Sequence, residues 1–289
     1  MASTLTKLFP TGILQTAVEL DEVTYSNIKI SPTGVYAAEF DEVNLTAGTA
    51  ERRTSAGVYM VSGYFDEYTL VQPLGIVTTG LRLHLDAGDP LSYPGSGTVW
   101  TDLASGLKGS MGAGVSYSST NNGVMVFNGG STAVVSVTTA STVTSLTNNI
   151  TIEGWYKSTN NHPEILSTGI GSNGVCLGYF STGGTNWKVT KYGVVDIYTG
   201  SIPQNTAWHQ VVVTYSSTAG TKVYVDGALS NASANTANIA ASNVPTVNIG
   251  TLESTYHNGS IGIIRWYNTV LSATDVLQNF NANRGRYGI

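Results

Sequence analysis

Short stretches in which apolar and polar residues alternate recur along most of the chain. The most apolar of them lies near the C-terminus, where a period of two places Gly262, Ile264 and Trp266 on one face of a strand. Ile261 and Ile263 then fall on the other face. Because both faces are apolar, this pattern predicts a strand that is covered on both sides and lies inside a sheet.

A helix is predicted directly after this strand. Ser272 is a favourable N-cap, and Asp275 three residues later completes a capping-box-like pair, with its carboxylate at the positive end of the helix dipole. Val276, Leu277 and Phe280 then give the helix one apolar face. We therefore expect the chain to close with a strand and a short capped helix.

The same alternation predicts many more short strands. Residues 81–86 are a clear example, with three leucines on one side of the strand. Asp226 and Gly227 separate two apolar runs and favour a two-residue hairpin, since both residue types tolerate positive φ. Further strand candidates are residues 124–127, 133–137, 150–156, 175–180, 187–190, 210–215, 221–225 and 246–249. So many short strands separated by turn residues predict a β-sandwich or a jelly roll.

The N-terminal part of the chain differs in charge. Residues 1–78 carry nine acidic and four basic residues, so their net charge of −5 equals that of the whole chain. A proline and glycines between residues 72 and 80 indicate a short linker. We expect a small all-β module over residues 1–78 and the sandwich over residues 79–289. Acidic pairs recur in this module, at residues 21–22, 41–42 and 66–67. We interpret them as solvated strand ends, with a cation site or a docking face as the alternative.

Composition narrows the classes of function. Only 11% of residues are charged, against roughly 25% in ordinary globular domains, and neither part of the chain is basic, which argues against nucleic-acid binding.

The single cysteine, Cys176, excludes an intrachain disulfide and is expected to be buried. The N-terminus lacks an uninterrupted apolar segment, and no run approaches the roughly 20 apolar residues of a membrane span. We therefore expect neither a signal peptide nor membrane insertion.

Four sequence blocks carry a resemblance to a known family. Asp86 and Trp100 stand in the first block, and Trp155, Trp208 and Trp266 mark the other three. The blocks cover residues 83–103, 151–155, 208–215 with 223–227, and 259–289. Over about residues 80–289 the chain resembles the concanavalin A-like, laminin G-type jelly-roll domain. The first and last blocks are most similar to the version found in virion proteins of tailed bacteriophages.

The resemblance implies an all-β protein with a small N-terminal β module, a jelly-roll β-sandwich and a short C-terminal helix. It also implies a structural protein on the surface of a phage virion, such as a head decoration or a short fibre, assembled in the host cytoplasm. Residues 1–78 would attach it to other virion proteins, such as the major capsid protein or a tail or neck protein. The sandwich would point outward for weak adhesion to carbohydrate or the host surface. A homo-oligomer and a tail or baseplate receptor-binding protein are left open.

Carbohydrate binding requires aromatic rings that stack on sugar faces, with amide and hydroxyl groups nearby on loops. Four tryptophans lie in the blocks of the family core, which leaves Trp187 as the exception, and Trp187 is equally compatible with a core position. The candidate carbohydrate-binding residues are Tyr93, Asn186, Trp187, Tyr192, Tyr256, His257 and Asn258.

A calcium site is a further alternative. Related pentraxin-type sandwiches bind calcium through acids and amides in the loop before the final strand. The matching residues 249–258 contain one carboxylate, Glu253, whereas Ca²⁺ usually takes roughly six to eight oxygen ligands, several of them charged. We therefore expect no cofactor, with calcium at Glu253 as the alternative.

Enzymatic activity is not expected. A glycosidase needs two carboxylates that face each other across a cleft, and its strand usually carries acids at alternate positions. Glu153 instead stands alone between Ile152 and Gly154, and we expect it to have a structural role. A polysaccharide-cleaving glycoside hydrolase that uses Glu153 is the alternative.

Overall fold

The computed structural model divides the chain into two compact units, Met1–Leu74 and Gly75–Ile289. The part of the chain that the structure describes consists of residues 28–30, 38–40, 44–46, 49–54, 57–62, 75–138, 149–159, 164–168, 174–179, 187–191, 194–199, 206–239, 246–252 and 254–289.

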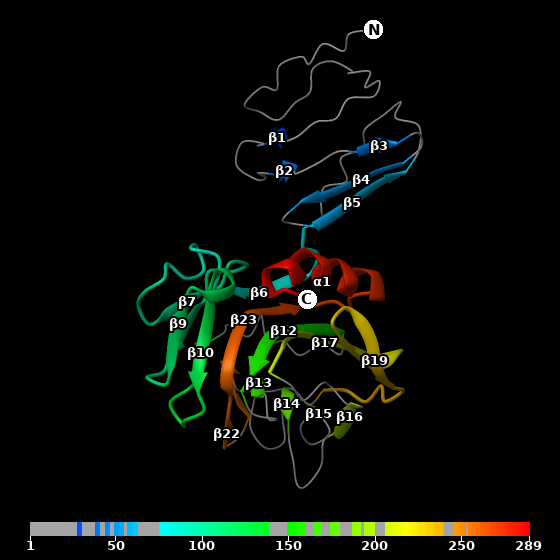
Figure 1. The fold of residues 1–289 in the computed structure, drawn as a ribbon. Coiled ribbons are helices and arrows are strands. Elements are labelled where there is room, and N and C mark those ends of the chain that lie inside the picture. Colours follow the sequence, from blue (N-terminus) through cyan, green and yellow to red (C-terminus); the bar gives the residue numbers. More distant parts are fainter. Residues whose placement is uncertain are drawn as a thin grey trace. The chain divides into compact units, whose positions relative to one another are not determined.

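The described residues of the first unit form short antiparallel strands (Figure 1). Strand β1 (Ile28–Ile30) pairs with β2 (Ala38–Phe40). Strand β4 (Thr49–Thr54) lies between β3 (Asn44–Thr46) and β5 (Gly57–Ser62). These strands agree with the predicted β module. The three acidic pairs lie outside the described residues.

The second unit contains two eight-stranded antiparallel sheets, named here sheet A and sheet B. In sheet A the order is β19 (Ala228–Ser233), β18 (Gly220–Val225), β17 (Trp208–Ser216), β12 (Ile150–Ser158), β23 (Asn258–Tyr267), β10 (Val124–Asn128) and β9 (Val115–Ser118), and β6 (Leu81–Asp86) also pairs with β23. In sheet B the order is β16 (Val195–Thr199), β15 (Trp187–Lys191), β14 (Val175–Tyr179), β13 (Glu164–Thr168), β20 (Thr246–Ile249), β11 (Val135–Thr138), β8 (Lys108–Met111) and β7 (Val99–Thr101). Strands β21 (Thr251–Leu252) and β22 (Thr255–Tyr256) form a separate small hairpin, and η1 (Thr120–Asn122) is a single 3₁₀ turn.

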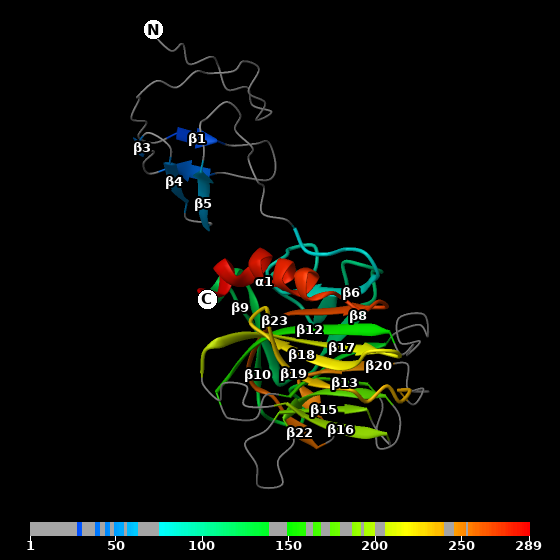
Figure 2. The ribbon, with the colours of Figure 1, turned by 90° about the vertical axis from the view of Figure 1, so that its right-hand side faces the viewer.

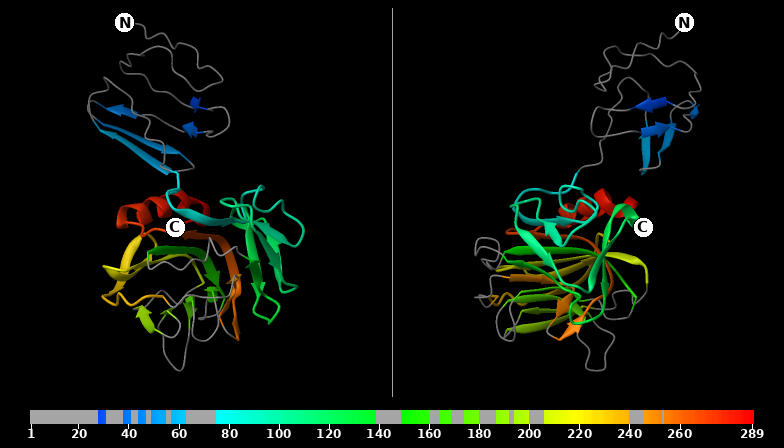
Figure 3. Two further views of the ribbon diagram at one scale, coloured as in Figure 1. Left: turned by 180° about the vertical axis from the view of Figure 1, so that it is seen from behind. Right: turned by 90° about the vertical axis from the view of Figure 1, so that its left-hand side faces the viewer.

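The two sheets stack as layers, and helix α1 (Ala273–Tyr287) lies against the outer face of sheet A (Figures 2 and 3). The core fills the space between the layers. Its largest members include Leu83, Trp100, Tyr215 and Trp266, all of which are buried. Each fully buried apolar side chain of this size contributes roughly 1.5–3 kcal/mol of stability. The fold class predicted from the sequence, a jelly-roll sandwich that ends in a helix, is confirmed.

Strand β23 is the central strand of sheet A. One of its edges pairs with β12 along almost its whole length, and the other edge is shared by β10 and β6. Of its residues, Ile261, Ile264 and Trp266 face sheet B, whereas Ile263 and Tyr267 face helix α1. The prediction of a covered, internal strand is therefore confirmed.

The predicted alternation within β23 is wrong at one point. The register with β12 shifts after Trp155, which pairs with Ile263, because the next residue pairs with Ile261 and Gly262 is left over as a bulge. The extra residue changes the phase of the alternation, so that Ile261 joins the inner face together with Ile264. Gly262 then points toward the helix, where any side chain would collide with the Tyr287 hydroxyl.

Helix α1 begins at the predicted cap. The Ser272 side chain accepts a hydrogen bond from the backbone of Asp275, and the Asp275 carboxylate accepts one from the backbone of Ser272, which completes the capping box. The helix is longer than expected, with 15 residues, and ends before Gly288 in a left-handed conformation (φ 73°). Leu277, placed on the apolar face by the sequence, is 46% exposed.

The buried face of the helix instead consists of Val276, Asn279, Phe280 and Tyr287. This spacing follows the helical period of 3.6 residues, which keeps positions three, four and seven apart on one side. The predicted Asp226–Gly227 hairpin turn is present, with positive φ at both residues (49° and 76°). Within the described residues, no helix is long and apolar enough to cross a membrane.

The close contact at Gly262 gives a stability prediction. We expect Gly262→Ala to lower the free energy of unfolding by roughly 1–3 kcal/mol, because the added methyl group overpacks a filled contact with the helix. Gly285→Ala, within the helix that Gly262 faces, is the matched control, since its new methyl group meets open space. We expect this variant to raise the free energy of unfolding by about 0.5–1 kcal/mol. Urea denaturation of both variants measures these changes. Equal stability of Gly262→Ala and the wild type would contradict the placement of the bulge.

Candidate functional site

Glu153, the candidate for hydrolysis, lies on the outward face of β12 and is completely buried. Its Oε1 accepts hydrogen bonds from Trp155 Nε1 (3.0 Å), Gln210 Nε2 (3.0 Å) and Arg265 Nη1 (2.8 Å). Its Oε2 accepts one from Asn279 Nδ2 (2.8 Å). Protein donors therefore hold both carboxylate oxygens, and the Arg265 guanidinium neutralises the charge.

This buried network joins sheet A to helix α1. Asn279 also donates to the hydroxyl of Tyr267 (2.9 Å) and accepts a hydrogen bond from the backbone of Val77 (2.8 Å). Arg265 contacts the helix a second time, through Asn283 Oδ1 (3.3 Å). Glu153 thus lies at the centre of contacts that fix the helix and the start of the unit, as expected for a structural residue.

Two of the predicted sugar-binding residues are buried. Tyr93 is 4% exposed, its ring lies 5.0 Å from the ring of Tyr117, and its hydroxyl donates to the carbonyl of Gly97 (2.8 Å). His257 is 0% exposed and packs edge-on against Phe127. Neither ring offers a free face for stacking on a sugar, which differs from the prediction. The local sequence did not reveal this burial, because both residues occur in polar, turn-like surroundings.

Two other candidates are partly accessible. Tyr256 is half-buried in β22, and Asn258 is exposed at the start of β23, where its carbonyl accepts a hydrogen bond from the backbone of Thr159 (2.8 Å). Trp187 begins β15, with Tyr179 and Thr199 as its strand partners. The side chain of Trp187 lies outside the described residues, as do Asn186, Tyr192 and Glu253.

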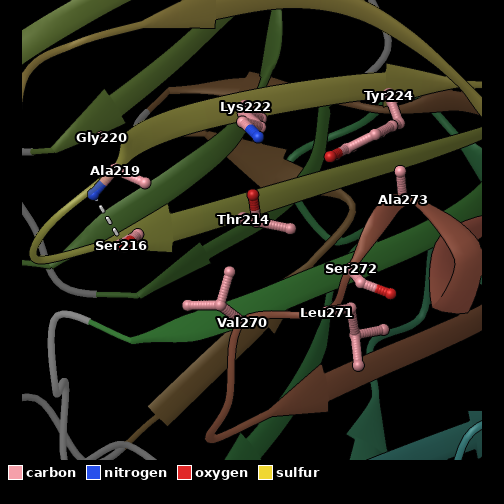
Figure 4. Close-up of a pocket in the computed structure, with 10 residues that line it drawn as sticks. All are labelled: Thr214, Ser216, Ala219, Gly220, Lys222, Tyr224, Val270, Leu271, Ser272 and Ala273. Atoms are coloured by element: carbon pink, nitrogen blue, oxygen red, sulfur yellow. Dashed lines mark hydrogen bonds between the residues drawn. The ribbon is translucent and has the colours of Figure 1, made fainter.

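A pocket of about 270 Å³ lies on the outer face of sheet A, at a position that the sequence did not indicate. Its floor is formed by Thr214 and Ser216 of β17 and by Lys222 and Tyr224 of β18 (Figure 4). The connection between β23 and α1, residues 270–273, forms one wall. The pocket is therefore made by side chains of two neighbouring strands and by the loop that leads into the helix.

The strand register explains why polar groups gather there. Thr214 pairs directly with Lys222 across the two strands, and Tyr224 follows two residues later on the same face. Figure 4 shows the hydroxyls of Thr214 and Tyr224 and the amine of Lys222 turned toward the pocket. The Ser216 hydroxyl instead accepts hydrogen bonds from the backbone of the following turn, including one from Ala219 N (3.0 Å). The pocket thus offers hydroxyl groups and a single ammonium group.

The sequence contained only a weak signal for this pocket. Thr214 and Lys222 are polar residues next to Val213 and Val223 on strands rich in valine, and such strands are usually covered on both faces. A polar outward position does not by itself indicate an opening in that cover, because Gln210 on the same face of β17 is buried and donates to Glu153. Only the path of the β23–α1 connection shows where the opening is.

Among the described residues, no group of three or more His, Cys, Asp or Glu side chains is placed to hold a metal ion. The floor and wall of the pocket likewise contain no carboxylate. The donors in this pocket suit a saccharide or an anion better than a cation, because calcium prefers carboxylate and carbonyl oxygens.

Residues 95–277 match the concanavalin A-like lectin/glucanases superfamily. The chain belongs to this superfamily. The match covers the sandwich from β7 into α1, and therefore includes both strands of the pocket floor and the loop of its wall. No curated protein matches the sequence significantly.

Several solved structures share the fold at low sequence identity. A structure of botulinum neurotoxin type C, a toxin whose cell entry is dependent upon interaction with two ganglioside molecules, is 14% identical (TM-score 0.54; 70% of this chain and 51% of that one). Trypanosoma rangeli sialidase is 17% identical (TM-score 0.54; 84% and 42%), and the binding domain of Paraclostridial Mosquitocidal Protein 1 is 14% identical (TM-score 0.54; 70% and 52%). This chain thus spans about half the length of each, and at these identities the likeness concerns the fold.

The Glu153 network gives a second prediction. We expect Glu153→Gln to lower the free energy of unfolding by roughly 3–5 kcal/mol, because Arg265 would be left buried without its counter-charge. The double variant Glu153→Gln/Arg265→Gln should lose less than the sum of the two single losses, since it removes both charges. Chemical denaturation of all four proteins measures this coupling. Additive losses would show that the two side chains do not depend on each other.

Burial of His257 gives a pH prediction. Burial lowers the pKa of His257 from 6.5 to about 4. Between these two values the unfolded chain binds a proton that the folded protein excludes, so the free energy of unfolding falls as the pH is lowered. Burial raises the pKa of Glu164 from 4.5 to about 7, which acts in the opposite sense because here the folded state holds the extra proton.

We therefore expect His257→Gln to reduce the loss of stability between about pH 7 and about pH 5, and Glu164→Gln to increase it. Urea denaturation at the two pH values gives, for each protein, the difference between its two free energies of unfolding. Comparing these differences among the three proteins removes any general destabilisation by the substitution. The same pH dependence in all three proteins would rule out both contributions.

Proposed function

We propose that this protein is a structural protein displayed on the surface of a bacteriophage virion, and that its lectin-like sandwich binds carbohydrate weakly. The pocket on sheet A is the observation that carries the binding role. It is lined by hydroxyls and one amine, and it lies on a fold whose solved relatives include a toxin that depends on gangliosides and a sialidase. Its small volume favours recognition of a single sugar unit, which is consistent with weak adhesion.

The virion location is supported by the resemblance of residues 83–103 and 259–289 to virion proteins of tailed phages. In this proposal the acidic N-terminal unit attaches the protein to other virion proteins, and the neutral sandwich is exposed. A decoration of the head or a short fibre suits a chain without coiled-coil heptads. A receptor-binding protein of the tail or baseplate is the second candidate, favoured by the likeness to the structure of botulinum neurotoxin type C and to the binding domain of Paraclostridial Mosquitocidal Protein 1.

We further propose that the protein binds saccharides without cleaving them and without a metal cofactor. The enclosure of Glu153 by four protein donors supports the first part, because a catalytic carboxylate must reach its substrate. The absence of carboxylates from the lining of the pocket supports the second part.

Two measurements test this proposal together. In purified particles of a phage that encodes this chain, mass spectrometry should find the protein at a constant ratio to the major capsid protein. The full-length protein should bind a subset of saccharides on a glycan array, with the same signal in the presence of EDTA and with the saccharides left intact. Absence from the particles would refute the virion role. Cleavage of a saccharide by the wild-type protein would contradict the binding-only role, and its loss in Glu153→Gln protein that thermal unfolding shows to be still folded would favour the hydrolase alternative.

A further inference from the structure

The pocket on sheet A carries an inference about the class of its ligand. We infer that it binds the carboxylate of an acidic sugar, with Lys222 as the counter-charge and the hydroxyls of Thr214 and Tyr224 as hydrogen-bonding partners. This inference rests on the proposed carbohydrate-binding function and extends it from saccharides in general to acidic ones.

The first argument is the charge of the pocket. Lys222 is the one charged side chain among the residues that line it. Within the described part of the chain, Lys222 makes no ion pair, in contrast to Arg265 and Arg286, which are both paired with carboxylates. A lysine ammonium carries three donors and no acceptor. An anionic group in the pocket would therefore receive a charge-assisted hydrogen bond, which is about twice as strong as a neutral one.

The second argument is a pair of hydroxyls that are available to a ligand. Thr214 is 1% exposed and Tyr224 is 3% exposed. Both side chains face the pocket (Figure 4), and neither hydroxyl has a hydrogen-bonding partner among the described residues. Neither oxygen is among the buried polar atoms without a partner, so both hydroxyls open into the pocket and can hydrogen-bond to a ligand there. Burial also raises the pKa of Tyr224 above its ordinary value, so its hydroxyl stays protonated and can donate.

The third argument is the start of helix α1. Ser272 and Ala273, at its N-terminus, form part of the pocket wall, and the positive end of the helix dipole favours a negative group there. The carboxylate of Asp275 already lies at this helix end, where it is hydrogen-bonded to the backbone and the hydroxyl of Ser272 (2.9 and 2.8 Å). The helix end is thus partly neutralised, and Lys222 is the charged group in the pocket lining that attracts an anionic ligand.

The size and charge of the pocket limit the ligand. Its volume of about 270 Å³ lies below the roughly 300–1,000 Å³ of sites for drug-sized ligands, so it accommodates one sugar unit. One cation matches the single charge of a carboxylate, whereas phosphate recognition usually uses several cations or a bidentate arginine. Val270 and Leu271 give the wall an apolar side that can pack against the C–H groups on one face of a sugar ring.

The experiment titrates the full-length protein with pairs of acidic and neutral sugars. The acidic probes are the methyl glycosides of glucuronic acid, galacturonic acid and N-acetylneuraminic acid, and the neutral ones are methyl glucoside and methyl galactoside. Acetate tests whether a free carboxylate is sufficient. Calorimetry gives the affinities, and amide chemical shifts locate the binding site on the sequence.

We expect at least one acidic sugar to bind more tightly than its neutral counterpart and than acetate, with shifts concentrated in β17, β18 and residues 270–275. Lys222→Gln should weaken this binding by roughly tenfold or more. Lys222→Arg should retain most of it. Thr214→Val should weaken binding with the charge unchanged, and Lys108→Gln, at an exposed lysine of sheet B, is the matched control.

Thermal unfolding of each variant shows whether it remains folded, and loss of affinity counts only in variants that do. Equal binding of acidic and neutral sugars, shifts elsewhere in the protein, or unchanged affinity in Lys222→Gln would overturn the inference. In any of these cases, binding on the glycan array and presence in the virion would leave the proposed function standing. Absence from the virion would refute that role, while the titration would still report on the pocket.

Discussion

The structure of the sandwich unit depends on one buried ion pair, between Glu153 of β12 and Arg265 of β23, on the outer face of sheet A. Two charges removed from water at the centre of a sheet face are tolerated only when they pair with each other and gain further hydrogen bonds that offset the loss of hydration. Helix α1 supplies such bonds, because Asn279 and Asn283 bind the two charged groups, and its Phe280 covers the neighbouring apolar part of the sheet. The path from β23 into the helix is thereby fixed, and with it the wall of the pocket.

Acidic residues of the first sequence block, residues 83–103, serve the fold in a similar way. Asp102 is buried and accepts hydrogen bonds from the backbones of His84 (2.6 Å) and Ala104 (2.9 Å), which holds the loop after β7 against β6. Asp86 pairs with Arg286 near the end of the helix (2.6 Å). In a sequence such carboxylates suggest chemistry, yet each one is engaged in closing a loop or holding a terminus. The acidic residues of these blocks therefore serve the fold.

The candidate site was only partly predictable. The sugar-binding candidates were predicted from residue type, as aromatic rings and amides. Tyr256 and Asn258 do lie at the surface, whereas Tyr93 and His257 are enclosed by neighbours distant in sequence. Residue type does not determine accessibility, because burial depends on what the other strands and loops contribute. Thr214 and Lys222 show the reverse case. Their alternation with apolar neighbours is ordinary for a strand, so the sequence did not single them out, yet both face the pocket.

The sequence by itself determined the class of fold, the central position of β23, the helix cap at Ser272 and the hairpin at Asp226. Each of these follows from local propensity, periodicity or turn chemistry, which act over a few residues. The tertiary structure decided the bulge at Gly262, the face that the helix buries and the partners of Glu153. It also decided the position of the pocket, because β17, β18 and the loop after β23 meet only when the sheet is assembled and the helix has docked on it.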